Sequence, residues 1–102
     1  MNTADARRCE VLLSLQRALL GEVTPNLRAV TVTYTDNTIH FEAFFDGPIS
    51  DAEREAMSLV ETEVLADFPP EHRVTHQVIR LDAQALVPKD RTWVYHRKES
   101  LL

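Results

Sequence analysis

The sequence predicts an α+β fold in which two helices pack on one face of a mainly antiparallel four-stranded sheet, in the order αββαββ. Two segments carry apolar residues at helical spacing, two adjacent segments alternate apolar and polar residues around a short turn, and two further strand-like segments follow. The chain has 102 residues, of which 44% are hydrophobic, so residues 1–102 are expected to form a single domain.

The first helix is predicted over residues 4–20, where apolar residues recur near helical spacing and charged residues occupy other positions. Thr3 can cap its first turn, and Gly21 can end it in a left-handed conformation. The single cysteine, Cys9, lies in the apolar pattern, so we expect it to be a small core residue and not a reactive thiol. Pro25 then directs the chain into a strand.

Residues 27–45 predict a β-hairpin, because apolar and polar residues alternate over residues 27–35 and again over residues 38–45. Asp36 and Asn37 tolerate positive φ and suit a two-residue turn between the strands. If Thr35 faces Thr38, one face of the hairpin is apolar and the other is mostly polar. The expected apolar pairs are Tyr34/Ile39, Val32/Phe41, Val30/Ala43 and Arg28/Phe45, and the pairs on the other face are Thr33/His40, Thr31/Glu42 and Ala29/Phe44.

The second helix is predicted from a capping box, in which Ser50 and Glu53 satisfy each other's backbone amides, to about Asp67. Pro69 and Pro70 end it. Its core-facing stripe is expected to contain Met57, Val60, Val64 and Phe68, widened by Ala56, Leu59 and Leu65.

The last third predicts strands over residues 73–81 and 92–98, joined by a long connection over residues 82–91. The connection is too long for a tight hairpin, so any pairing of these two strands would enclose an irregular loop.

The helices leave the second face of the sheet at least partly exposed. On that face we expect Leu27, Ala29 and Phe44 to form an apolar patch that joins a dimer or a partner, unless the C-terminal strands or Leu101 and Leu102 cover it.

Charge is unevenly distributed along the chain, whose formal net charge is −5. Residues 46–71 carry a net charge of −7, whereas residues 72–102 carry +3. One interpretation is a solvated helix face, and the other is an acidic recognition surface for a basic protein partner. The candidate partner-binding acids are Glu42, Asp51, Glu55, Glu61 and Glu63.

Several function classes lack their signals in the sequence. The acidic balance argues against duplex nucleic acid as the main partner. No segment is long and apolar enough to cross a membrane, and residues 1–10 have no signal-peptide centre, so we expect no membrane partner and a cytoplasmic location. The four histidines match no metal-ligand spacing, and the two glycines form no nucleotide loop, so we expect no metal or cofactor and no enzyme.

Two other functions stay open at this point. One is a homodimeric structural or regulatory protein joined through the open sheet face or an edge strand. The other is a small hydrolase or metal-dependent enzyme, which would need His40, His76 or His96 to converge with acids in a pocket.

Five stretches of the chain carry a further signal, and they cover residues 24–30, 45–50, 61–68, 80–82 and 94–98. Together they resemble small bacterial immunity proteins of contact-dependent growth inhibition and related polymorphic toxin systems. The resemblance implies a non-enzymatic protein that binds one cognate toxin domain and occludes or distorts its active site. One departure is Pro48, where members of such families are expected to carry an acid after the Asp-Gly pair.

Overall fold

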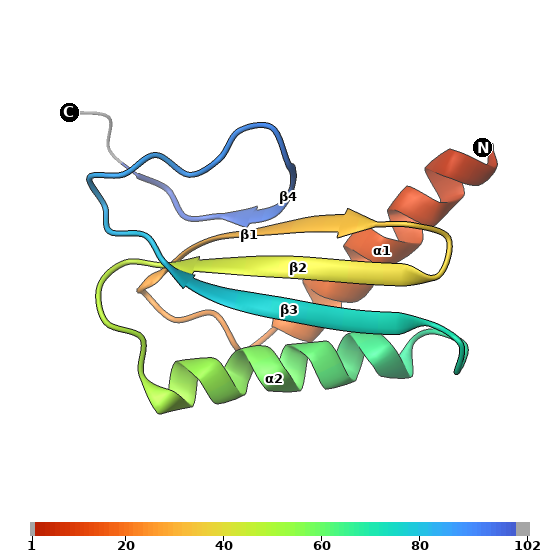
Figure 1. Cartoon of the computed structure of the whole chain (residues 1–102), viewed down its shortest axis with the longest axis horizontal. Helices are drawn as coiled ribbons and strands as arrows, with labels where there is room; N and C mark the ends of the chain where they lie inside the picture. Colours follow the sequence, from red (N-terminus) through yellow and green to blue (C-terminus); the bar gives the residue numbers. More distant parts are fainter. Residues whose placement is uncertain (1, 100–102) are drawn as a thin grey trace.

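The computed structural model describes residues 2–99 and contains two helices and four strands in one sheet. The α+β class and the mostly antiparallel sheet are confirmed (Figure 1). Leu101 and Leu102, considered above as a cover for the open sheet face, lie outside the described residues. The elements in chain order are α1 (Thr3–Leu19), β1 (Leu27–Tyr34), β2 (Thr38–Phe45), α2 (Asp51–Ala66), β3 (Arg73–Arg80) and β4 (Thr92–His96).

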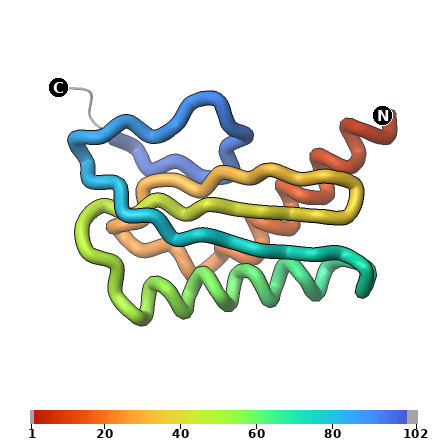
Figure 2. The backbone as a smooth tube through the Cα atoms, in the orientation of Figure 1, coloured from red at the N-terminus to blue at the C-terminus, as the bar shows by residue number. Residues whose placement is uncertain are grey.

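The strands lie in the order β3-β2-β1-β4 across the sheet. The pairs β1–β2 and β1–β4 are antiparallel, whereas β2 and β3 are parallel and are connected through α2. A parallel pair needs such a crossover, and α2 provides it. The last two strands do not pair, because they occupy opposite edges of the sheet. The connection between them therefore passes from one edge to the other, and in Figure 2 it rises past the left-hand ends of β2 and β1 and then curves above β4.

The main hydrophobic core lies between the helices and one face of the sheet. The buried stripe of α1 repeats at Val11, Leu15 and Ala18, and that of α2 repeats at Met57, Val60 and Val64. These spacings of three and four residues bring the apolar side chains onto one side of each helix. The strands contribute alternating residues to the same core, which are Val30, Val32, Ile39, Phe41, Ala43 and Phe45.

The stripes of the helices are narrower than predicted. The expectation that Cys9 is a core residue is wrong, because it is exposed and lies on a different side of α1 from the repeat that begins at Val11. Leu59 and Leu65 were expected to widen the stripe of α2, but they are 50% and 44% exposed. Residues one or five positions from a core residue lie about 100–140° around a helix from it, which explains their exposure.

The hairpin register is confirmed from Ala29/Phe44 to Tyr34/Ile39. The expected Arg28/Phe45 pair is wrong, because a β-bulge between Leu27 and Ala29 inserts Arg28 as an extra residue and pairs Leu27 with Phe45. Leu27 therefore joins the main core, and the Arg28 side chain is directed elsewhere.

The hairpin turn forms without the positive φ for which Asp36 and Asn37 are suited, since the described residues with positive φ are Gly21 and Gly47 alone. Instead, the Thr35 hydroxyl closes the turn. The Thr35 and Thr38 hydroxyl oxygens are 2.6 Å apart, and the Thr38 backbone N–H donates to Thr35 Oγ1 at 3.1 Å.

Polar side chains fix the beginning of both helices. The Asn2 side chain, one residue before the expected cap, accepts from the Asp5 N–H at 2.8 Å. The predicted capping box is confirmed, because Ser50 Oγ accepts from the Glu53 N–H and Glu53 Oε1 accepts from the Ser50 N–H, both at 3.1 Å. Burial raises the pKa of Glu53, but hydrogen bonds from Ser50 and Thr24 outweigh it, so the pKa of this carboxyl lies below its usual value.

We predict that Ser50→Ala lowers the free energy of unfolding by about 1 kcal/mol, because it removes the side chain that accepts from the first turn of α2. Urea denaturation at neutral pH measures this change. Ser58→Ala is the matched control, since the Ser58 hydroxyl only donates to the Arg54 carbonyl within the helix. Equal stability of the Ser50 variant and the wild type would contradict the prediction.

Candidate partner-binding surface

The five candidate acids do not form one surface. Glu42 alternates along β2 with the core residues Phe41 and Ala43, so it lies on the sheet face away from the helices. There it forms an ion pair with Arg91 of the connection between β3 and β4, and its side chain is 14% exposed. Glu42 therefore secures the connection and does not extend the acidic face of α2.

Glu61 faces the neighbouring strand β3. Its Oε1 lies 2.7 Å from His76 Nδ1, and the His76 ring stacks on Phe41 with centroids 5.2 Å apart. The carboxylate is still partly accessible, since 34% of the Glu61 side chain is exposed. Glu61 thus joins α2 to β3 at the border of the exposed helix face.

The remaining three candidates lie along one row of α2. Asp51, Glu55, Leu59 and Glu63 follow one another at intervals of four residues, and all four are exposed. Residues four apart are neighbours on a helix surface, so these side chains form a continuous line, which we call the α2 ridge. Within residues 2–99, no ion pair involves Asp51, Glu55 or Glu63. The ridge therefore presents three uncompensated carboxylates around an exposed leucine.

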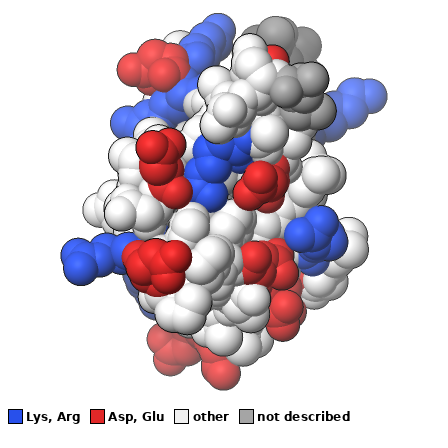
Figure 3. Space-filling model, turned by 90° about the vertical axis from the view of Figure 1, so that its right-hand side faces the viewer, with Lys and Arg blue, Asp and Glu red and all other residues white. Residues whose placement is uncertain are grey.

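The charge of α2 dominates one border of the molecule. Figure 3 shows acidic side chains without Lys or Arg along the lower edge of the face in view, which is the side of α2 in Figure 1. Higher on the same face, basic and acidic side chains alternate. Carboxylates gathered at one border attract a basic molecule over a longer range than dispersed ones do.

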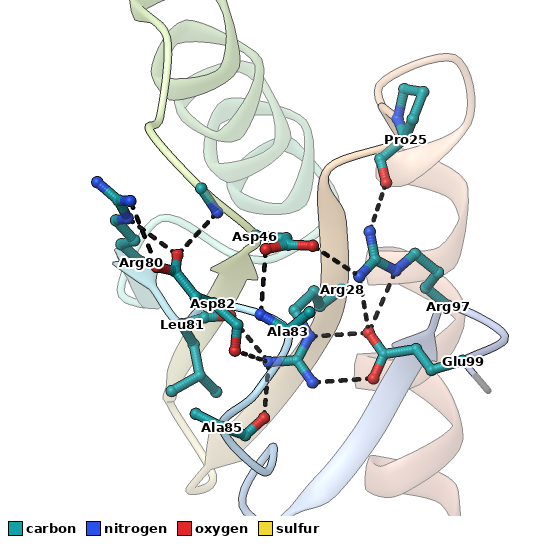
Figure 4. A network of polar contacts seen from close by, with 11 residues as sticks. Pro25, Arg28, Asp46, Arg80, Leu81, Asp82, Ala83, Ala85, Arg97 and Glu99 are labelled. Carbon is teal, nitrogen blue, oxygen red and sulfur yellow. Dashed lines mark hydrogen bonds and ion pairs between the residues drawn. The ribbon is translucent and has the colours of Figure 1, made fainter. Parts of the chain in front are cut away.

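A second polar cluster centres on Arg28, which is buried with 2% relative exposure. Its Nε and Nη2 donate to the two carboxylate oxygens of Glu99 at 2.8 and 2.9 Å (Figure 4). Its Nη1 donates to the backbone carbonyls of Leu81, Asp82 and Ala85 at 2.8–3.0 Å. A buried guanidinium with this many acceptors is compensated, and it fixes both the connection after β3 and the segment after β4 to β1.

Further contacts extend this cluster, which we call the Arg28 network. The Arg97 side chain donates to Glu99, to Asp46 and to the Pro25 carbonyl. Asp46 accepts from the Ala83 N–H at 3.1 Å, which holds the start of the connection. The hydrogen bonds from Arg28 and, to a smaller extent, from Arg97 lower the pKa of Glu99 to about 2 against the effect of burial. These carboxylates are occupied by arginines, so the network anchors the chain.

No motif in the sequence marks this network as a site. One signal was present, because alternation assigned Arg28 to the apolar face of the hairpin, where an unpaired charge would be costly. The bulge resolves this conflict by turning the side chain toward Glu99.

The expected apolar patch is covered and not open, which is the second of the two alternatives, because Leu27, Ala29 and Phe44 are all buried, with at most 3% relative exposure. The bulge places Leu27 in the main core. Ala29 and Phe44 form a small second core with Val87 of the connection, against which Trp93 also packs. The connection thus covers the surface on which a dimer interface was expected.

The histidines occupy separate environments. His40 Nδ1 lies 2.8 Å from Thr75 Oγ1, and His76 contacts Glu61. The centroid of the His96 ring lies 4.4 Å from that of the Trp93 ring. In the part of the chain that the structure describes, no group of three or more His, Cys, Asp or Glu side chains could hold a metal ion. Of these three histidines, His76 contacts an acid, Glu61, but it forms no metal-binding group with other described residues.

Neither helix among the described residues combines the length and apolar character needed to cross a membrane. The expected cytoplasmic location stays a prediction.

A comparison with known protein families matches residues 8–99 to the family described as MafI2 immunity protein. The matched range includes all four strands, α2 and most of α1. A search of curated proteins found no match. The family description agrees with the resemblance to immunity proteins noted in the sequence, while the assignment to contact-dependent growth inhibition stays a prediction.

We predict that Glu99→Gln lowers the free energy of unfolding at pH 7 by about 2 kcal/mol, because it leaves the buried Arg28 guanidinium without a counter-charge. This is less than the full pKa shift implies, since a fifth of the Glu99 side chain is exposed. The wild-type carboxylate, with a pKa of about 2 instead of 4.5, stabilises the fold above pH 4.5 and loses this effect as the pH falls toward 2.

The measurement is urea denaturation from pH 7 to pH 2, in which the variant should lose less stability on acidification than the wild type. Glu63→Gln, at an exposed residue of the α2 ridge, is the control and should change stability by less than about 0.5 kcal/mol. Equal changes in the free energy of unfolding for Glu99→Gln and Glu63→Gln would contradict the role of Glu99 as the counter-charge of Arg28.

Proposed function

Because the chain belongs to the MafI2 immunity protein family, we propose that it neutralises one cognate toxin domain by binding it directly, without catalysing a reaction. The family supports the immunity role, and the exposed α2 ridge supports the mode of action. Binding would cover or distort the active site of the toxin, so no chemistry by the immunity protein is required.

The α2 ridge is the proposed contact surface, and its partner is a basic face of the toxin. Asp51, Glu55 and Glu63 supply negative charge, and no ion pair within residues 2–99 has to be broken to release them. Complementary charge accelerates encounter and disfavours wrong partners. Glu61 adjoins this surface with its accessible part, whereas Glu42 is not included because it lies on the other sheet face beside Arg91.

Leu59 is the proposed apolar anchor of the interface. It is 50% exposed and lies on the ridge between Glu55 and Glu63. An apolar side chain surrounded by polar neighbours is the arrangement in which binding energy concentrates, because the rim keeps water from the buried centre.

We predict that Glu55→Lys and Glu63→Lys each weaken binding of the cognate toxin domain about fivefold, mainly by slowing association. Surface plasmon resonance at low and high salt measures both rate constants, and the salt dependence of association should decrease in each variant. Asp36→Lys is the matched control, because Asp36 is an exposed acid at the hairpin turn, remote in sequence from α2.

Affinity and salt dependence equal to the wild type in both ridge variants would refute the ridge as the contact surface. Absence of binding between the wild-type protein and its toxin would instead refute direct binding.

We predict that Leu59→Ala weakens toxin binding about tenfold, or by about 1.4 kcal/mol, because it removes the apolar centre of the interface. Its free energy of unfolding should change by less than about 0.5 kcal/mol, since the side chain is half exposed in the free protein. Leu13→Ala is the control, because Leu13 on α1 is 51% exposed and lies outside the ridge. Isothermal titration calorimetry of both variants tests the prediction, and equal affinities would contradict it.

A further inference from the structure

A groove is lined by residues of the connection over residues 81–91, of β4 and of the segment after β4. β4 lies at the edge of the sheet opposite to β3 (Figure 1). The groove has a volume of about 460 Å³. Leu86, Val87 and Trp93 provide its apolar lining, and Leu86 is 77% exposed. We call it the β4 groove. An apolar lining on a surface of this size is suited to an apolar side chain of a partner.

The β4 groove is basic, although the protein as a whole is acidic. The chain contains two lysines, Lys89 and Lys98, and both line this groove. Among residues 2–99, neither lysine forms an ion pair. Glu99 is the one acidic residue in the lining, and Arg28 and Arg97 occupy its carboxylate. As far as residues 2–99 are concerned, the two ammonium groups are therefore the uncompensated charges of the groove.

We propose that the β4 groove is a second protein-binding surface, which takes an acidic peptide segment that carries an apolar side chain. The apolar side chain would lie against Leu86 and Trp93, and flanking carboxylates would meet Lys89 and Lys98. This proposal does not depend on the α2 ridge, because the groove lies at the other edge of the sheet and carries the opposite charge.

The arrangement favours an acidic peptide over a nucleic acid. Arginines bind phosphate through bidentate hydrogen bonds, but both arginines of the groove already donate to Glu99. A polyanion would also be repelled by the overall charge of −5, whereas a short segment with two or three carboxylates meets mainly the local field of the lysines.

Trp93 makes the groove directly measurable, because it is the only tryptophan of the chain. The probe is a synthetic peptide that has Asp and Glu on both sides of a single Leu and contains no Trp or Tyr. Titration of the full-length protein with this peptide should change the Trp93 fluorescence saturably, with half-saturation well below about 1 mM. The same peptide with Lys in place of the acids, and a short single-stranded oligonucleotide, should produce no saturable change.

The variant Lys89→Glu/Lys98→Glu should weaken peptide binding at least about tenfold. The variant Arg8→Glu/Arg54→Glu makes the same change in charge at two exposed residues that do not line the groove, and should bind like the wild type. A second measurement uses the wild type alone: the bound peptide should slow acetylation of both lysines by an amine-reactive ester, as read by mass spectrometry.

Equal peptide binding by the two double variants, or acetylation that the peptide does not slow, would overturn the proposal. Saturable binding of the oligonucleotide alone would also overturn it and would identify a nucleic-acid surface instead. None of these three results bears on toxin binding by the α2 ridge, because the ridge variants leave the groove intact.

Discussion

The bulge at Arg28 directs a buried guanidinium toward one carboxylate and three backbone carbonyls, and the position of the long connection depends on these contacts. Burying a charge is costly unless hydrogen bonds compensate it, so the native position of Arg28 requires the connection and Glu99 to be in place. The connection in turn covers Ala29 and Phe44 with Val87 and forms one side of the β4 groove. The one extra residue in β1 therefore determines which part of the second sheet face the connection covers.

The sequence carried enough information for the elements whose signals are local. Alternation fixed the register of Val32 against Phe41, and the Ser50/Glu53 spacing located the start of α2. No glycine marks the bulge in the sequence, so the direction of the Arg28 side chain could not be predicted. Alternation along a strand does not show whether its neighbour runs parallel or antiparallel, so the parallel pairing of β3 with β2 could not be predicted either. The second sheet face was expected to be open because Val87 lies in a segment without periodicity.

The acidic surface of α2 could also be predicted in part, because part of its signal is local. Spacing along a helix places Asp51, Glu55 and Glu63 in one row, and this needs no tertiary information. The contacts of Glu61 and Glu42 could not be predicted, because their partners His76 and Arg91 come from other elements of the fold. Leu59 was assigned to the core because apolarity alone does not distinguish a buried side chain from an exposed one at the border of the stripe.

The strand order has a consequence for how the chain acquires its fold during synthesis. β1 is an inner strand, but its second neighbour is β4, which the ribosome synthesises after the other five elements of the described residues. Until then one edge of β1 exposes unpaired backbone groups, and Arg28 has no carboxylate from Glu99. Nascent chains therefore pass through a stage with an open, β-branched edge that can recruit another strand, and closure by residues 92–99 ends that exposure.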